Sequence, residues 1–489
     1  MDTKKEEASA FALIAAMANN TGMHGLPNVG RSQHIVRKVF WMLIFLAGAG
    51  MLIWQVYEAL AQYYSYPTKT SIIPKVYNKL NLPAVTICNV NPVRKSLLYQ
   101  LDALTDPSDR NYENFQTAMN ALNVTEKQKI GHQLKDMMLY CNYNGYTCEV
   151  GNFTTFYNSY LGNCFTFNGG NRPTVDGLGK TGPYYGLDIE FYIEQDEYEP
   201  EYSEYAGMKV VIHNPKEMSF PEDQGLFVSP GAKSQVSLKK IENTRADPPH
   251  GECRTFNEEE TKARNAYKDS YDYLEYTSKA CGKTCYQQYV MSKCGCYDTS
   301  YPSTGSAFEN ITSGKTFSSC KSLNSTYTDC NTAVYYNYTD NIISCANMCP
   351  PACTEVLYDM TTSNLAWPSV NALSEIVKKL EDKSTALNTT IQNMTEIEKE
   401  SFVRKNVVSI SVFYGSLEVT KIKTEPSFGL VDLLFAIGGS VGLWLGLSVI
   451  SVIEIVELLY DISSILVCCC FKTKPNGNNP KTIQVDPQS

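Results

Sequence analysis

The residues that could do chemistry are small and acidic side chains in one apolar stretch near the C-terminus. Four glycines recur there at spacings of one, three and four residues: Gly438, Gly439, Gly442 and Gly446. A helix would gather them on one broad face, where two backbones can approach closely or narrow around an ion. Glu454 and Glu457 follow one turn apart, and acids at the edge of a spanning helix usually face water or a bundle interior. The pattern fits an ion pathway, and it fits a simple membrane anchor packed through its small residues equally well.

Either alternative requires a spanning helix to position these residues. Residues 433–453 form an apolar run without a formal charge, long enough to cross a bilayer core. A second apolar run covers residues 39–57 and is preceded by Arg31, Arg37 and Lys38, which places the N-terminus in the cytosol. Two crossings return the C-terminus to the cytosol. We therefore expect a multi-pass plasma-membrane protein with both termini inside.

The topology divides the chain into five segments. They are a cytosolic N-terminus (1–38), a first transmembrane helix (39–58), an extracellular domain (59–430), a second transmembrane helix (431–459) and a cytosolic tail (460–489). Of the 17 cysteines, 14 lie between the helices, an even number that suits disulfides in an oxidising compartment. N-glycosylation acceptors also lie there, at Asn123, Asn152, Asn310, Asn324, Asn337, Asn388 and Asn393.

Composition and motifs exclude several classes. The 489 residues have a net charge of −9, which does not suggest nucleic-acid binding. No nucleophile elbow, phosphate loop or HExxH sequence occurs, so we expect neither an enzyme nor a cofactor. Zinc binding would need reduced cysteines, so no metal site is expected outside the cell.

Local patterns predict the elements of the extracellular domain. Residues 84–88 predict a short strand and residues 129–140 an amphipathic helix. Residues 186–192 and 208–213 predict strands of one central antiparallel sheet. Residues 371–404 predict a charged helical segment.

Three further stretches complete the extracellular domain. Ten cysteines between residues 253 and 353 predict a disulfide-stapled lobe. Residues 407–414 and 417–423 predict a hairpin around a Gly-Ser pair. The acidic loop from Glu194 to Glu204 is interpreted as solvated, with a cation- or ligand-binding rim as the alternative.

Seven segments together resemble hallmark segments of the degenerin/epithelial sodium channel/acid-sensing ion channel family. They are LPAVTICN (82–89), GNCFTFN (162–168), MKVVIHNPKE (208–217), CGKTCYQQYVMSKCGC (281–296), CPPACTEVLY (349–358), WPS (367–369) and GGSVGLWLGLS (438–448). The resemblance implies an α+β membrane protein with two transmembrane helices and a disulfide-rich extracellular domain of palm sheet, helical thumb and finger. It also implies a homo- or heterotrimer in membrane lipid that conducts sodium ions and is blocked by amiloride.

Roles for particular residues follow from the same resemblance. The selectivity filter falls on Gly446-Leu447-Ser448, where carbonyl and hydroxyl oxygens would replace part of the hydration shell of an ion. His24-Gly25 corresponds to the gating motif, on a re-entrant segment below the filter. The pore-lining positions are Phe435, Ala436, Gly438, Gly439, Gly442, Glu454 and Glu457.

The resemblance also implies the disulfides and the mode of gating. The implied pairs are 88–164, 141–148, 253–353, 281–349, 285–345, 294–330 and 296–320. Ser65 and Tyr66 stand where acid-sensing relatives have histidines, and an Arg-x-x-Arg activation site is absent. We therefore expect gating by an extracellular ligand such as a neuropeptide, as in the invertebrate peptide-gated branch, at a pocket near residues 100–160. The alternatives are a proton-modulated or constitutively open channel of the same family and, in another class, a two-pass scavenger or receptor protein.

Overall fold

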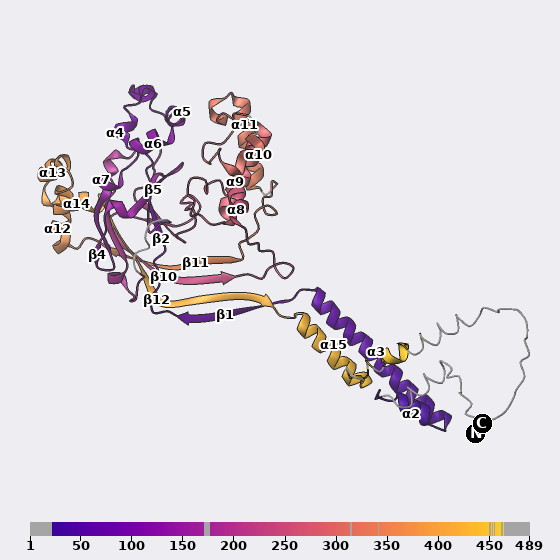
Figure 1. Ribbon diagram of the computed structural model, residues 1–489. Helices are drawn as coiled ribbons and strands as arrows, with labels where there is room; N and C mark the ends of the chain where they lie inside the picture. The colour runs from indigo at the N-terminus through magenta and orange to yellow at the C-terminus, as the bar shows by residue number, and fades with distance from the viewer. Residues whose placement is uncertain are drawn as a thin grey trace, which may run out of the picture. The chain divides into compact units, whose positions relative to one another are not determined.

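The computed structural model describes residues 22–170, 177–312, 315–340 and 342–448, together with Ser451, Ile453, residues 455–460 and Ser463 (Figure 1). The chain divides into two compact units. One comprises residues 1–69 and 426–489, and the other residues 70–425. Each unit is described separately.

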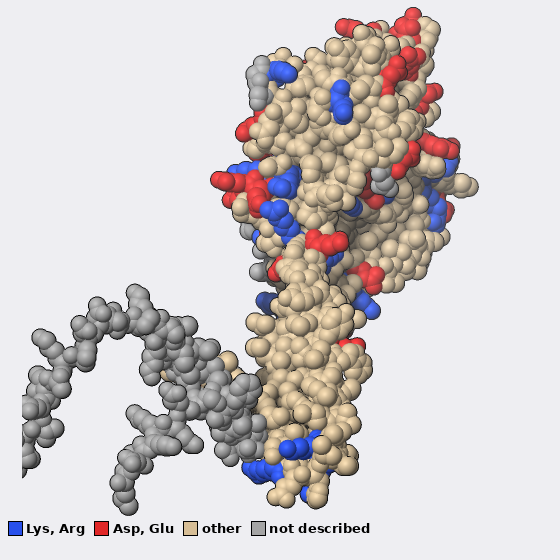
Figure 2. All heavy atoms as spheres, turned by 90° about the vertical axis from the view of Figure 1, so that its right-hand side faces the viewer, with Lys and Arg blue, Asp and Glu red and all other residues tan. Residues whose placement is uncertain are grey.

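The first unit is helical. It contains α2 (Leu26–Arg31), α3 (Ile35–Tyr64) and α15 (Leu430–Leu445), and α15 lies beside α3 (Figure 1). Among the described residues, α3 is the one helix long and apolar enough to cross a membrane, and α15 is a shorter apolar helix. The surface of this helix pair is almost free of charged side chains, apart from a group of Lys and Arg at one end (Figure 2). The helix α3 extends beyond the predicted 39–58 at both ends.

A five-stranded antiparallel sheet lies in the second unit, in the order β5-β6-β2-β8-β9. Its strands are β2 (Ala84–Asn89), β5 (Phe153–Asn158), β6 (Gly162–Phe167), β8 (Met208–His213) and β9 (Leu226–Val228). All six residues of the central strand β2 are buried, which accounts for its lack of polar alternation. The predicted strand at 84–88 is confirmed.

A seven-stranded sheet has the order β11-β10-β12-β7-β3-β4, with β1 paired to β12. Its strands are β1 (Thr68–Val76), β3 (Met138–Tyr143), β4 (Tyr146–Thr147), β7 (Leu187–Tyr192), β10 (Ala232–Thr244), β11 (Thr354–Ala366) and β12 (Val407–Pro426). Within it, β10 and β12 run parallel. Buried side chains of both sheets form one core cluster that includes Val85, Phe167, Ile189, Val236 and Val412.

The prediction of a single central sheet was wrong, although both of its strands exist. β8 pairs with β2 in the five-stranded sheet, where Val211 lies opposite Thr86. β7 pairs with β12 and β3 in the seven-stranded sheet. Local alternation indicates a strand, but long-range packing decides its partner.

The predicted helix at 129–140 was also wrong. α6 ends at Ile130, and Gly131 forms its C-cap in an extended conformation. Only Leu134–Met137 forms a short helix, α7, and from Met138 the chain enters β3. Leu134 and Met137 are buried in the core, so their helical spacing reflects one short turn followed by a strand.

The predicted hairpin at 407–423 is instead one continuous strand, β12. Opposite β10, the register moves from Leu238–Tyr414 to Lys240–Val419, so a bulge occupies the Gly-Ser region. A Cβ on Gly415 would lie 2.3 Å from Ser237 Oγ, which shows why the closest approach needs glycine. The turn residues produced an irregularity in the strand and not a reversal.

Helices of the second unit form three groups along the chain. They are α4 (Lys95–Leu98), α5 (Tyr112–Ala121), α6 (Val124–Ile130) and α7; then α8 (Glu258–Arg264), α9 (Ser278–Cys294), α10 (Glu309–Thr312) and α11 (Ser325–Thr339); then α12 (Leu373–Glu381), α13 (Thr385–Gln392) and α14 (Glu396–Asn406). Capping boxes at Asn123 and Thr395 fix the starts of α6 and α14. The predicted helical character of 371–404 is confirmed.

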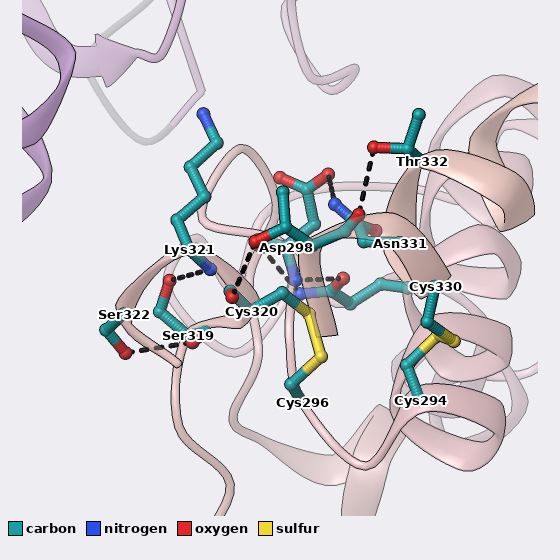
Figure 3. Close-up of a disulfide and its surroundings, with 12 residues drawn as sticks. Cys294, Cys296, Asp298, Ser319, Cys320, Lys321, Ser322, Cys330, Asn331 and Thr332 are labelled. Carbon is teal, nitrogen blue, oxygen red and sulfur yellow. Dashed lines mark hydrogen bonds between the residues drawn. A yellow bond between two sulfur atoms is a disulfide. The ribbon is translucent and has the colours of Figure 1, made fainter. Parts of the chain in front are cut away.

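Seven disulfides staple the second unit. They are Cys88–Cys164, Cys141–Cys148, Cys253–Cys353, Cys281–Cys349, Cys285–Cys345, Cys294–Cys330 and Cys296–Cys320. These are the pairs that the resemblance implied. Five of them lie in the α8–α11 group and its connections to the sheet, and Figure 3 shows the two that hold the end of α9. This group therefore has a covalent framework in place of a large apolar core.

Candidate functional site

Two helices of the first unit make a close, specific contact. Gly48 of α3 lies against the backbone of Trp444 in α15, and a Cβ there would be 3.2 Å from the Trp444 carbonyl oxygen. The indole Nε1–H of Trp444 donates to Oε1 of Gln55, 2.9 Å away. A small residue and a buried polar bond are the usual means of joining helices in lipid.

The helix α15 ends at Gly446, whose left-handed conformation (φ +69°) caps it. The backbone N–H of His24 donates to the carbonyl of Leu445 over 2.8 Å. The His24 ring lies so close to Gly446 that an added Cβ would be 2.6 Å from Cδ2. Next to it, Gly25 is also left-handed (φ +83°) and caps α2. The structure thus brings the His-Gly pair together with the Gly-Leu-Ser segment, 421 positions later in the sequence.

Backbone and hydroxyl oxygens are concentrated at this break. Ser448 Oγ lies 3.2 Å from Ser451 Oγ, and the Ser448 N–H also faces Ser451 Oγ. Non-helical backbone at membrane depth is tolerated where it lines protein or water. Oxygen ligands of this kind are what a partly dehydrated alkali cation requires.

Three of the other predicted pore positions are exposed on α15 in the single chain. Phe435, Gly438 and Gly439 are exposed, and nothing lies within 4 Å of a Cβ added to either glycine. Ala436 is half-buried, and its carbonyl accepts from Ser440. The remaining positions are Gly442, half-buried, and Glu457, exposed, whereas Glu454 lies outside the described residues.

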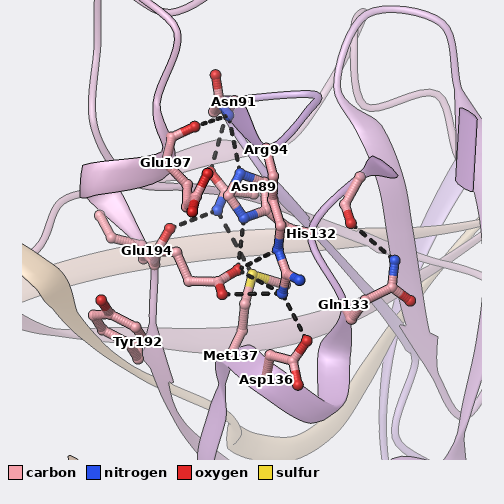
Figure 4. A network of polar contacts seen from close by, with 12 residues as sticks. Asn89, Asn91, Arg94, His132, Gln133, Asp136, Met137, Tyr192, Glu194 and Glu197 are labelled. Atoms are coloured by element: carbon pink, nitrogen blue, oxygen red, sulfur yellow. Dashed lines mark hydrogen bonds and ion pairs between the residues drawn. The ribbon is translucent and has the colours of Figure 1, made fainter. Parts of the chain in front are cut away.

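A buried polar network occupies the second unit where β2 leads into α4 (Figure 4). The guanidinium of Arg94 binds both carboxylate oxygens of Glu194 and reaches Asp136 Oδ2 at 2.7 Å. In Figure 4 its side chain lies between these two acids. Two-point binding of this type gives the strongest ion pairs of proteins. Arg94 and Glu194 keep only 16% and 13% of their side chains exposed, so this pair is poorly screened by water.

The buried His132 extends the network. Asn91 Oδ1 accepts from the Glu199 N–H, so its Nδ2 faces His132 Nε2 at 2.9 Å. Nε2 is therefore the acceptor, and Nδ1 carries the proton that binds Glu194 Oε2 at 2.7 Å. His132 thus links Asn91 to Glu194 within the network.

A pocket of about 410 Å³ opens on this network. Its charged lining comprises four carboxylates (Asp136, Glu194, Asp196 and Glu197) against two cations (Arg94 and Lys383), a formal net charge of −2. Arg94 offsets one of the two negative charges of Asp136 and Glu194, and Asp196 and Glu197 add two further negative charges to the lining. The rings of Tyr192 and Phe402 provide the apolar wall. We call this cavity the acidic pocket.

The acidic loop from Glu194 to Glu204 is thus only partly a solvated loop. Glu199 is buried at 3% exposure and accepts from the Tyr99 hydroxyl, and Glu194 is locked by Arg94. Sequence reasoning missed Arg94 and His132, because neither belongs to a motif and their partners lie tens of residues away.

One further carboxyl group has an unusual environment. Burial, with the nearby carboxylates of Glu355 and Glu275, raises the pKa of Glu217 to about 7. Glu217 lines a cavity of about 210 Å³ at the base of α9, together with Arg245 and Lys279. This group changes charge near neutrality.

The predicted glycosylation sites all lie in the described part of the chain. The exposed ones are Asn123, Asn152, Asn310, Asn324 and Asn393. Asn337 and Asn388 are half-buried. The first five offer the easier access for a glycan.

These features define a class: a membrane ion channel subunit, with an apolar helix pair, a break lined by oxygen atoms and a disulfide-rich domain. The chain belongs to the amiloride-sensitive sodium channel family, whose model matches residues 17–458. Members of this family are ion channels and not enzymes.

Two of the relatives in this family are named for a ligand. The FMRFamide-activated amiloride-sensitive sodium channel of Cornu aspersum is 26% identical over 98% of this chain and 87% of its own length. The bile acid-sensitive ion channel of Mus musculus is 26% identical over 91% of this chain and 86% of its own length. Epithelial sodium channel subunit alpha of Neoceratodus forsteri is 25% identical over 94% of this chain and 82% of its own length.

Proposed function

We propose that the chain is a subunit of a trimeric, sodium-selective, amiloride-sensitive channel of the plasma membrane, with both termini in the cytosol. Residues 431–459 form the second, pore-lining transmembrane segment, and Gly446-Leu447-Ser448 forms the filter. The observation that carries the proposal is the contact between His24 and Gly446. A simple anchor has no use for a helix broken at a glycine and held by a distant segment.

The rest of the pore follows from the exposed positions on α15. Phe435, Ala436, Gly438, Gly439 and Gly442 would line the pore where three copies meet, because small residues let helices approach an ion. Glu454 and Glu457 would form rings of carboxylates that favour cations. The family assignment removes the scavenger or receptor alternative.

We further propose that an extracellular peptide opens the channel, and that it binds in the acidic pocket. The name of the snail relative's activator spells Phe-Met-Arg-Phe with an amidated end, a peptide with two positive charges and no carboxylate. Asp196 and Glu197 would receive the cations, and Tyr192 and Phe402 the aromatic side chains. The cavity nearer residues 100–160 carries lysines and suits such a peptide less well.

Two-electrode voltage clamp on oocytes that express this chain tests both proposals. Amidated Arg-Phe peptides should evoke a current that amiloride blocks and that disappears when a large organic cation replaces sodium. The combined change Asp196→Asn and Glu197→Gln should lower peptide potency at least about tenfold, since it removes two of the four carboxylates that line the pocket. The control is Glu204→Gln, an exposed acid of the same loop.

The outcomes separate the two proposals. A standing amiloride-sensitive sodium current without a peptide response would retain the pore and reject peptide gating in favour of a constitutive or proton-modulated channel. An anion current would reject the pore.

A further inference from the structure

A second cavity of about 320 Å³ lies between α5 and α6 on one side and residues 299–321 of the α8–α11 group on the other. Tyrosine rings line it, from Tyr112, Tyr157, Tyr160 and Tyr202. The Ser159 hydroxyl donates to the carbonyl of Ser300 at 3.4 Å, so the two walls touch beside it. The volume and aromatic lining are typical of a small-molecule site.

Two ammonium groups face this cavity without a counter-ion. Within the described residues, neither Lys127 nor Lys321 forms an ion pair. Burial and then the nearby Lys321 charge lower the pKa of Lys127, whose Nζ lies 5.9 Å from the centre of the Tyr157 ring. The single lining carboxylate among the described residues is Glu201, which is exposed. The cavity therefore has a formal net charge of +1, from the half-buried Lys127 and the exposed Lys321 against Glu201, and this charge favours an anionic ligand.

An orphan hydroxyl points to the same need. The Tyr202 hydroxyl is fully buried and, within the described residues, has no hydrogen-bond partner. Burial raises the pKa of Tyr202, so the hydroxyl keeps its proton and is available as a donor. A buried donor without an acceptor is rare and costly. A ligand oxygen would satisfy it once the neighbouring side chains move apart enough to admit that oxygen.

The cationic wall has a fixed backbone. Lys321 follows Cys320, which is bound to Cys296, and its N–H lies 3.3 Å from Ser319 Oγ. Figure 3 shows the Lys321 side chain extending away from this disulfide. On the other wall, the Tyr202 ring packs 5.7 Å from Phe115. The backbone that carries Lys321 and the ring of Tyr202 are thus held before any ligand arrives, which lowers part of the entropic cost of binding.

We propose that this cavity binds an amphipathic organic anion, a carboxylate or sulfonate on a ring-containing apolar body. Lys127 and Lys321 would hold the anionic head, Tyr202 would donate to it, and the other tyrosine rings would cover the body. The ligand is opposite in charge to the peptide proposed for the acidic pocket, so one chain would carry two ligand sites of different chemistry. A bile acid, the activator named for the murine relative, has this chemistry and serves as the probe.

The test uses full-length channel in detergent and radiolabelled taurocholate. The competitors are unlabelled cholate, its uncharged methyl ester and laurate, an anion with a straight chain in place of rings. Lys127→Gln and Lys321→Gln should each weaken binding about ten- to hundredfold, because each removes a charge-assisted bond. Tyr202→Phe should weaken binding less, because losing the bond to the ligand is partly offset in the free protein, where the buried hydroxyl without a partner is also removed. The control is Lys129→Gln, an exposed lysine of the same helix. Thermal unfolding of each variant without ligand verifies its fold.

Saturable binding that falls in the two lysine variants, persists in the control and discriminates against the methyl ester would support the site. Equal competition by the ester, or unchanged binding in both lysine variants, would overturn it, and equal competition by laurate would overturn the ring-containing body. This readout needs no current, so it does not depend on the proposed channel function. Whether taurocholate alters the current is measured separately in oocytes, where the consequence for gating does rest on that function.

Discussion

Replacing Gly446 with alanine should disrupt the break in α15 for two independent reasons. A left-handed backbone costs a residue with a Cβ about 1–2 kcal/mol. The new methyl carbon would also lie 2.6 Å from Cδ2 of His24, so the ring would have to move by about 0.8 Å to reach an ordinary contact of 3.4 Å. That movement strains the bond between the His24 N–H and the Leu445 carbonyl, which measures 2.8 Å.

The control is Gly50→Ala in α3. Nothing lies within 4 Å of a Cβ added to this exposed glycine, and alanine favours a helix by about 1 kcal/mol over glycine. We expect this variant to reach the cell surface and conduct sodium. The double variant His24→Ala, Gly446→Ala should recover part of the lost current, because it removes the clash and leaves only the backbone strain.

The assay combines surface biotinylation with reversal potentials in sodium and in potassium. Gly446→Ala should lower the current at equal surface amount and bring the sodium-to-potassium permeability ratio closer to one. The reasoning fails if Gly446→Ala behaves like Gly50→Ala, or if removing the His24 ring recovers nothing.

Three further predictions concern the second unit. Lys379→Met should lower the stability of the second unit by about 3 kcal/mol, because it leaves the buried carboxylate of Glu190 without its ion-pair partner. Lys378→Met, at an exposed position of the same helix, should have little effect, and thermal unfolding distinguishes the two variants. Glu217→Gln should stabilise the unit relative to wild type most above pH 7. Because the pKa of Glu217 in the folded protein is raised to about 7, its contribution to wild-type stability is full below about pH 4.5 and falls as the pH rises to about 7. An equal change of unfolding temperature between pH 5 and pH 8 in the two proteins would contradict this prediction. Replacing both cysteines of the disulfide between β2 and β6 with serine should cost about 4–5 kcal/mol, because its loop spans 76 residues, and surface expression should fall sharply.

Patterns confined to a few neighbouring residues were predicted well. The strand at 84–88, the helical character of 371–404 and the disulfide-stapled lobe all depend on local composition or cysteine spacing. The helix at 129–140 failed because Gly131 ends one helix and Met138 begins a strand, and the spacing of Leu134 and Met137 fits both a helix and this mixture. The strand partners in the two sheets could not be predicted from the sequence, because contacts between residues far apart in the chain decide them.

The candidate sites divide in the same way. The Gly-Leu-Ser segment has a recognisable composition and could be singled out early. Its contact with His24 could not be worked out from the residues alone, because two segments separated by 421 positions have no local signal. The sequence around Arg94 gave no signal either. Its role in the network depends on Glu194 and Asp136, which only folding brings close to it.

The bulge in β12 has a mechanical consequence. The strand has twenty residues, about 65 Å at a rise of roughly 3.3 Å per residue, and it is the longest strut in the described part of the sheet. Before the bulge, β12 pairs with β10 on one side and with β7 on the other, and after the bulge it pairs with β10 and β1. Between these two sections, residues 415–418 face a single residue of β10, so this is where the strut is most compliant. If the end of β12 next to α14 moved, the bulge would deform, and the movement that reached Pro426 would be smaller. The sequence of those four residues would then determine how much of a movement in the second unit is transmitted along β12 towards Pro426.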